Sequence, residues 1–320
     1  MSPEAASGGG ADLEGLADGA VVFRRQHSAR HLAVFLALAL LGLGMYGFVT
    51  NAEFQFDDEP NITNCLAVRM ETLTPETLRR AVLEAGAPNR VIVSLSFALQ
   101  HWAAQFLPRL VDDQPPKPDL LPWQFRIFNL CVHLLAGFAV YLLFLRLLQL
   151  PRVARHVGAR VWPLAALASL LWFCSPVQTQ AVTYVVQRAT SLSTLFYVLA
   201  IFCYLTARAE RRLAGQAAWF GLMLLAALAS GFCKEIGATL ILAVPVLEWW
   251  LIRTPRSRAW ILLTLALLGL VAAFQIRWFY GRGKGEGGGG SGTAEARIGD
   301  AVRGVKRDLW TRILEDRPVS

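Results

Sequence analysis

Four acidic residues lie within seven consecutive positions: Glu53, Asp57, Asp58 and Glu59. Neighbouring carboxylates repel each other, so one of them tends to keep its proton or the pair tends to hold a cation. The first behaviour suits a general base. The second suits a divalent metal, Mg²⁺ or Mn²⁺, that clamps a phosphate group. Asp57 and Asp58 are therefore candidate catalytic residues and candidate metal ligands. The alternative is a solvated acidic loop, which the motif alone favours.

Two later polar segments offer cations for the same chemistry. Residues 175–188 contain a single cation, Arg188, and a short polar segment contains the pair Lys234-Glu235. Arginine binds phosphate through two parallel hydrogen bonds. An arginine at a helix end can also simply extend toward the membrane interface, and Lys234-Glu235 can be only an ion pair at a helix start. Both interpretations stay open on these residues alone.

Long apolar blocks separate these polar segments. Hydrophobic residues make up 55% of the 320 residues and charged residues only 17%, whereas a soluble domain carries about 25% charged residues. Crossing a bilayer takes roughly 20 apolar residues, and shorter blocks can gain length from Trp, Tyr and Arg at their edges. The sequence predicts an all-α, polytopic membrane protein with about seven transmembrane helices. The seven apolar blocks are 32–49, 127–148, 161–173, 192–207, 213–232, 238–252 and 260–274.

Arginine clusters predict the orientation of these helices. If all seven blocks cross, four clusters fall on one side, which the positive-inside rule makes cytoplasmic together with the N-terminus. The acidic pair, Arg188 and Lys234 then share the opposite face. Basic residues after position 279 conflict with that topology, and an even number of spans would remove the conflict. The four clusters lie within 24–30, 146–160, 208–212 and 253–258.

Three regions follow from the composition. Residues 1–30 are polar and rich in Gly and Ala, which predicts a disordered cytoplasmic tail. Residues 31–280 form the membrane domain, with 51–124 as its long outside loop. Residues 281–320 combine a Gly-rich linker with a short amphipathic helix. The net charge of +8 is explained by arginines that flank apolar blocks, so we expect no nucleic-acid partner.

The long outside loop has helical signals of its own. Thr74 can cap a helix that has Pro75 at its first position and Glu76 in its first turn, and Gly86 would end this helix. Residues 90–107 are mostly apolar but shorter than a comfortable span. We expect them to form a helix that lies in the interface without crossing.

The order of these motifs resembles the membrane domain of the GT-C superfamily of glycosyltransferases. The closest resemblance is to the N-terminal membrane part of bacterial relatives of the transmembrane O-mannosyltransferases that carry tetratricopeptide repeats. It covers roughly residues 32–280. Ser175 stands where the family usually has His, and Val91 stands where it usually has Pro. The family continues with further helices, so the resemblance is to an incomplete GT-C-like domain. The matching stretches are Phe56-Asp57-Asp58, 89–97, 125–135, 175–188 and Lys234-Glu235.

This resemblance implies an inverting glycosyltransferase of the bacterial inner membrane. Such an enzyme takes a sugar from a polyprenyl-phosphate donor and transfers it to a protein or glycan on the periplasmic or lumenal face. Asp57 and Asp58 would act as base or metal ligands, and Arg188, Lys234 and Glu235 would bind the donor phosphate. The alternative is a truncated, non-catalytic membrane scaffold or accessory protein of the same fold. A transporter is disfavoured, because only His133 lies near the membrane midplane.

Overall fold

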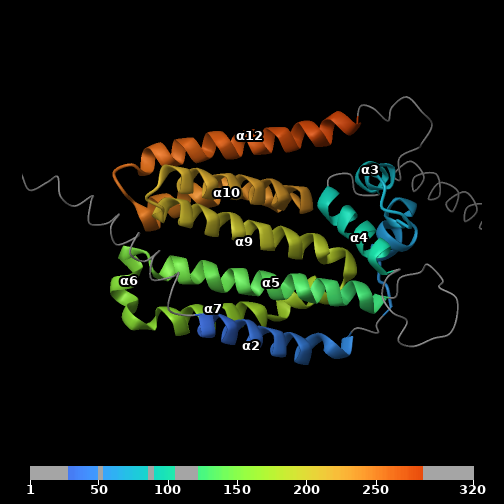
Figure 1. Ribbon diagram of the computed structural model, residues 1–320, viewed down its shortest axis with the longest axis horizontal. Coiled ribbons are helices and arrows are strands. Elements are labelled where there is room, and N and C mark those ends of the chain that lie inside the picture. Colours follow the sequence, from blue (N-terminus) through green and yellow to red (C-terminus); the bar gives the residue numbers. More distant parts are fainter. Residues whose placement is uncertain (1–27, 50–52, 86–89, 105–121, 284–320) are drawn as a thin grey trace, which may run out of the picture. The chain divides into compact units, whose positions relative to one another are not determined.

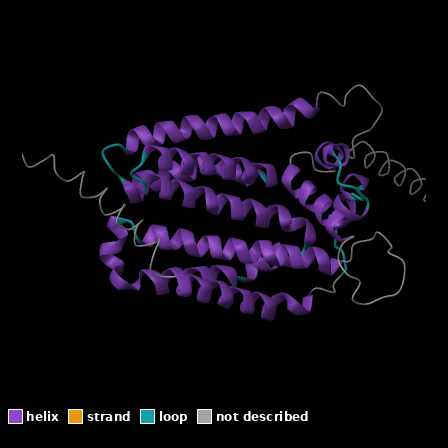
Figure 2. Ribbon diagram, viewed as in Figure 1, coloured by secondary structure: helices purple, strands orange, loops and turns teal. Residues whose placement is uncertain are grey.

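The computed structural model describes residues 28–49, 53–85, 90–104 and 122–283. Within these ranges all regular secondary structure is helical (Figure 2). Contacts divide the chain into one unit up to Gln275 and a second from Ile276. The candidate site lies in the first unit. The predicted tail, linker and amphipathic helix lie almost entirely outside the described residues, although α2 already begins at Ser28, inside the predicted tail.

Six helical segments of the described chain are long and apolar enough to cross a membrane, which confirms a polytopic α-helical membrane protein. A seventh crossing results if a helical pair bent by 52° counts as one span. All seven predicted apolar blocks are helical. The spans are α2 (Ser28–Tyr46), α5 (Pro122–Leu148), Val185–Ala209 with α9 (Arg188–Ala209), α10 (Leu213–Cys233), Glu235–Ile252 and α12 (Ser257–Gly283) up to Phe279.

The bent pair and the fifth span, Glu235–Ile252, are built from shorter elements. In the pair, α6 (Pro151–Val157), η5 (Gly158–Arg160) and α7 (Val161–Phe173) lead into η6 (Pro176–Gln178) and α8 (Thr179–Thr183). Before α9 comes η7 (Val185–Gln187). The fifth span consists of η8 (Glu235–Thr239), α11 (Leu240–Leu247) and η9 (Glu248–Ile252).

The segment between α2 and α5 contains the predicted helices. In α3 (Pro75–Leu83), Thr74 accepts the Thr77 backbone N–H and the Thr77 hydroxyl accepts the Thr74 N–H, which is a reciprocal cap with Pro75 in the first turn. The predicted interfacial helix is α4 (Val91–Ala104), whose 14 residues are fewer than the roughly 20 that a span requires. The remaining elements are η2 (Gly47–Val49), η3 (Glu59–Thr63) and η4 (Leu66–Val68).

Small residues let the central helices approach closely. Between α9 and α10, the Ser193 hydroxyl donates to the Ser230 carbonyl over 3.1 Å and the Ser230 hydroxyl donates to the Ser193 carbonyl over 2.9 Å. Between α5 and α7, a Cβ at Gly137 would lie 2.7 Å from the Phe173 ring. Such contacts stabilise helix pairs in a bilayer, where apolar surface alone gives little driving force.

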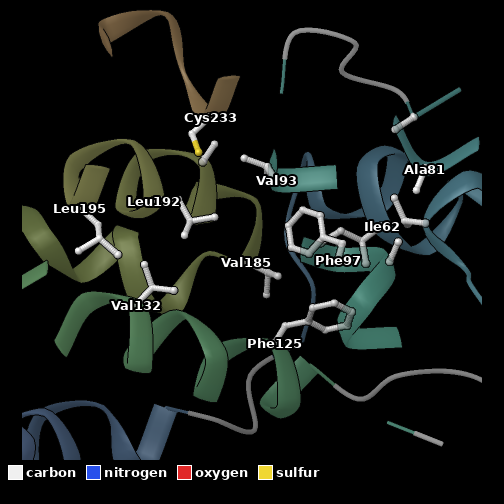
Figure 3. Packing of buried hydrophobic residues seen from close by; sticks show 14 of the residues in the cluster. Ile62, Ala81, Val93, Phe97, Phe125, Val132, Val185, Leu192, Leu195 and Cys233 are labelled. Atoms are coloured by element: carbon white, nitrogen blue, oxygen red, sulfur yellow. The ribbon is translucent and has the colours of Figure 1, made fainter. Parts of the chain in front are cut away.

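One hydrophobic cluster joins α4 to the ends of α5 and α9 (Figure 3). Phe97 of α4 and Phe125 of α5 form an edge-to-face pair with ring centroids 5.8 Å apart. Val185 lies beside them at the start of the third span. We call this end of the first unit the acidic end, because the loop that carries Asp57 and Asp58 also lies there (Figure 1).

At the other end of α9 lies a buried polar network centred on Glu248. The buried Glu248 carboxylate accepts two hydrogen bonds from Arg208, over 2.8 and 3.0 Å. It also accepts the Tyr204 and Ser257 hydroxyls, each over 2.6 Å. This network joins α9, η9 and the start of α12, and its complete pairing indicates a structural role.

Candidate active site

Asp58 connects the loop that follows α2 to the start of the span Val185–Ala209. Its side chain is fully buried. Oδ1 accepts the backbone N–H of Val186 over 2.8 Å, and Oδ2 accepts that of Gln55 over 3.1 Å. Because Val186 lies 128 positions further along the chain, this carboxylate holds together two segments that the sequence separates.

Asp57 has the opposite environment. Its side chain is exposed, while its backbone is held from both sides. The Asp57 N–H donates to the Tyr184 hydroxyl over 3.0 Å, and the Asp57 carbonyl accepts the Asn61 amide over 2.8 Å. The preceding Phe56 has a φ of +40°, a conformation that costs a non-glycine residue free energy and occurs preferentially at functional sites. The loop thus presents the Asp57 carboxylate to the surface on a fixed backbone.

Burial raises the pKa of Asp58 above its ordinary value of 3.8. Hydrogen bonds from the Gln55, Val186 and Val185 backbone and the nearby charge of Arg126 act in the other direction but do not cancel the effect of burial. The pKa of Tyr184 is also raised, chiefly by burial, so its hydroxyl keeps its proton at neutral pH.

Arg126 belongs to this site, although it is not among the site residues predicted from the sequence. It is almost fully buried in the first turns of α5. Its Nε donates to the Thr183 carbonyl over 2.8 Å and its Nη2 to the Glu53 carbonyl over 2.6 Å. Arg126 therefore fixes both segments that Asp58 joins. The signal that could have revealed it is a lone arginine immediately before an apolar block.

Arg188 lies at the first position of α9 and is fully buried. Its Nε donates to the Asn129 side-chain oxygen over 2.7 Å, and its Nη2 donates to the Gln100 side-chain oxygen over 2.7 Å and to the Phe125 carbonyl over 3.2 Å. A weaker bond of 3.3 Å joins Nη1 to the Ser96 hydroxyl. These acceptors are all neutral groups of the protein, so a phosphate would have to displace them to reach this guanidinium.

Aromatic rings complete the surroundings of Arg188. Its guanidinium carbon lies 4.3 Å from the ring centroid of Phe97 and 4.2 Å from that of Phe128, which is the geometry of a cation–π contact. Asn129 also holds the turn that precedes Arg188, because its amide donates to the Val185 carbonyl over 3.2 Å. Arg188 thus joins α4, α5 and α9 at the acidic end.

Lys234 reaches the same helix start from the end of α10. It is half-buried, and its Nζ donates to the Thr190 hydroxyl over 2.7 Å. The neighbouring Glu235 is exposed. Gly237 permits this arrangement, because a Cβ there would lie 2.5 Å from the backbone nitrogen of Gly231. A larger residue at position 237 would push the Lys234-Glu235 segment away from α10.

The structure therefore gathers most of the predicted site residues at the acidic end. Asp58 bonds to Val186, two residues before Arg188, and Lys234 bonds to Thr190, two residues after it. In the described part of the chain, no three His, Cys, Asp or Glu side chains come together as a metal site. A divalent metal on Asp57 and Asp58 would need water or substrate oxygens as its other ligands. His133 is buried, and its Nε2 lies 3.3 Å from the Phe173 carbonyl, which suits packing.

Replacing Asp58 with alanine should destabilise the protein without removing an exposed group. Two backbone N–H groups would lose their acceptor, and the buried Arg126 would lose its nearby opposite charge. We expect the unfolding free energy to fall by about 3 kcal/mol, measured by thermal unfolding in detergent. Asp57→Ala, which changes an exposed side chain next to it, is the matched control and should change stability by less than about 0.5 kcal/mol.

The pH dependence of stability gives an independent readout. Because the pKa of Asp58 is raised in the folded state, the folded protein binds this proton more tightly than the unfolded chain does. The stabilisation that comes from this proton is fully present below the pKa of the unfolded chain and is lost as pH rises through the pKa of the folded protein. Asp58→Ala should flatten the dependence of the unfolding free energy on pH in this range. An unchanged slope would contradict the raised pKa of Asp58.

Comparison with known proteins supports a distant relation to a glycosyltransferase. Over 129 residues the chain is 31% identical to protein O-mannosyl-transferase Tmtc2 of Drosophila melanogaster. The match covers 40% of this chain but only 13% of that protein. No protein-family model and no solved structure matches the chain. Together, the helical spans and this partial similarity support a glycosyltransferase-like membrane protein.

Proposed function

We propose that the chain is the membrane part of a glycosyltransferase that uses a polyprenyl-phosphate-linked sugar as its donor. The observation that carries the proposal is the convergence of Asp57, Asp58, Arg126 and Lys234 at one end of the helices, tied together by the Asp58–Val186 hydrogen bond. Carboxylates there can serve an acceptor hydroxyl and cations can serve a phosphate leaving group. The partial similarity to a protein O-mannosyl-transferase raises the weight of this interpretation.

In the proposed reaction the two adjacent acids have different roles. The exposed Asp57 carboxylate takes the proton of the acceptor hydroxyl. The acceptor oxygen then forms a bond to the anomeric carbon of the sugar while the bond from that carbon to the phosphate oxygen breaks. The polyprenyl phosphate leaves with the electron pair, and this single displacement inverts the anomeric configuration. Asp58 positions the loop and does not itself touch the substrate.

The donor phosphate would bind at the end of α10 and the start of η8. Lys234 is only half-buried and can direct its ammonium group toward an anion, and Glu235 would orient that segment. Arg188 would contribute positive potential from its buried position, or a direct contact if substrate binding displaces its present partners. Asp57 would supply a carboxylate ligand to Mg²⁺ or Mn²⁺, which would provide positive charge for the phosphate leaving group when bound.

The proposed orientation follows from charge. Exposed arginines concentrate at the end of the first unit opposite the acidic loop, which the positive-inside rule makes cytoplasmic. The N-terminus would then be cytoplasmic, and transfer would occur on the periplasmic or lumenal face, as in a bacterial inner membrane. The acceptor would be a protein or a glycan on that face.

A non-catalytic scaffold or accessory protein of the same fold is the second candidate. The observation that favours it is the buried state of Arg188, whose hydrogen-bonding partners are neutral groups of the protein. Under this alternative, the acidic end would bind a protein partner and transfer no sugar.

A transfer assay in proteoliposomes separates the two candidates. The purified chain would be supplied with polyprenyl-phosphate-linked mannose or glucose, a mixture of acceptor peptides and Mg²⁺ or Mn²⁺. Glycosylated peptide that depends on the protein would support the enzyme. Donor hydrolysis or transfer no faster than in empty liposomes, for each donor and metal, would favour the scaffold.

A further inference from the structure

The end of the first unit opposite the acidic loop carries many exposed arginines. In the described residues of this end, the acidic side chains are Glu210 and Glu248. Glu248 is bound to the buried Arg208, and the Glu210 carboxylate accepts the backbone N–H groups of Arg211 and Arg212. The exposed arginines outnumber these two carboxylates, so the surface keeps a net positive charge. The exposed arginines are Arg30, Arg155, Arg160, Arg211, Arg212, Arg253, Arg256 and Arg258, and Arg152 beside them is half-buried.

The short link of α6 and η5 concentrates part of this charge beside the membrane. Leu150 is buried in the core and Val153 packs against the same cluster, so the link is anchored through its apolar side. Arg155 and Arg160 are exposed. The link therefore packs its apolar side on the protein and leaves Arg155 and Arg160 accessible to a ligand.

Arg30 and Trp162 extend this basic surface onto two spans. The Arg30 guanidinium carbon lies 5.7 Å from the centroid of the Trp162 ring, and Trp162 lies in the first turn of α7, two residues after Arg160. Tryptophan is enriched at the level of lipid headgroups. Beside it, α2 and α7 expose Leu32 and Leu167, 57% and 51% of whose surface is accessible.

This combination fits one class of ligand. Guanidinium groups bind a phosphate through charge-assisted hydrogen bonds, and exposed leucines one or two turns away suit acyl chains. A nucleic acid also carries phosphates, but it has no acyl chains that would contact the exposed leucines. We propose that Arg155 and Arg160 of the α6–η5 link, together with Arg30 at Trp162, bind the headgroup of an anionic phospholipid. This lipid-binding surface is separate from the acidic end and does not depend on the proposed transferase activity.

Native mass spectrometry of the detergent-purified full chain tests the proposal. Phosphatidylglycerol and phosphatidylcholine with the same acyl chains would be added in equal amounts. We expect the wild type to retain phosphatidylglycerol in preference. The double variant Arg155→Gln/Arg160→Gln should weaken phosphatidylglycerol binding by roughly tenfold or more, since each basic residue contributes appreciably near an anionic headgroup. Phosphatidylcholine binding should not change.

A matched variant keeps the result interpretable. Arg79→Gln/Arg80→Gln removes the same charge from exposed positions of α3, where these arginines pair with Glu76 and Glu84, and should alter phosphatidylglycerol binding by less than twofold. Arg155→Lys/Arg160→Lys should keep most of the binding, and equal melting temperatures would show that each variant folds. Equal loss in both glutamine variants, or a wild type that does not distinguish the two lipids, would overturn the proposal.

Discussion

Asp57→Asn should lower sugar transfer by a factor of about 10² to 10⁴, the usual contribution of a single general base. Asn keeps the shape of the side chain but accepts no proton and is a poor ligand for a divalent metal. The fold should be unaffected, because the Asp57 side chain is exposed and the loop is held through its backbone atoms. Initial rates in proteoliposomes with saturating donor give the size of the effect.

Glu59→Gln is the matched control for this variant. Glu59 is an exposed acid two positions further along the same loop, and its substitution removes the same charge. We expect it to retain at least half of the wild-type rate. If Asp57→Asn turned over at the wild-type rate, Asp57 would have no part in the chemistry. If both variants lost activity equally, the loop would act only through its total charge.

Arg188→Met should cost about 3–5 kcal/mol of unfolding free energy, since each buried acceptor left without a donor costs about 1–3 kcal/mol and a desolvated cation–π contact contributes about 2 kcal/mol. Methionine replaces much of the volume but none of the hydrogen bonds. The side-chain oxygens of Asn129 and Gln100 would lose their donor in a buried site, and the cation–π contacts with Phe97 and Phe128 would be lost. Thermal or denaturant unfolding in detergent measures the change.

A surface arginine provides the comparison. Arg80→Met removes an exposed arginine that pairs with Glu84 within one helix, and such pairs contribute only about 0.3–0.5 kcal/mol. Unchanged stability in Arg188→Met would mean that Arg188 is not a structural residue. A direct role in phosphate binding would then be the better interpretation, and donor affinity would be the property lost.

Apolar length and local capping made much of the fold predictable. Each predicted block is helical because a bilayer leaves the backbone no other means of pairing its polar groups. The helix after Thr74 could be foreseen because its cap uses residues three positions apart. Residues 90–107 predict a helix because they are mostly apolar, and the structure has a helix at 91–104.

The arrangement within the site could not be predicted in the same way. The sequence presents Asp57 and Asp58 as equivalent neighbours, and their difference arises because Asp58 meets a backbone N–H from position 186. The surroundings of Arg188 likewise depend on Gln100 and Asn129, which lie on two other helices. Arg126 acts on carbonyl groups, and the residue types that carry those carbonyls give no signal in a sequence.

We propose that residues from distant segments form one binding site for a lipid-linked phosphate at the acidic end. Photocrosslinking with a photoactivatable polyprenyl phosphate, followed by peptide mapping, tests it most directly. We predict labelling of peptides that contain 53–58 and 234–239, and a decrease of about tenfold or more in Lys234→Gln, which removes a charge-assisted hydrogen bond. Arg80→Gln should label like the wild type. Labelling confined to the peptide that contains Arg155 and Arg160, or labelling of the acidic end that Lys234→Gln leaves unchanged, would contradict the account.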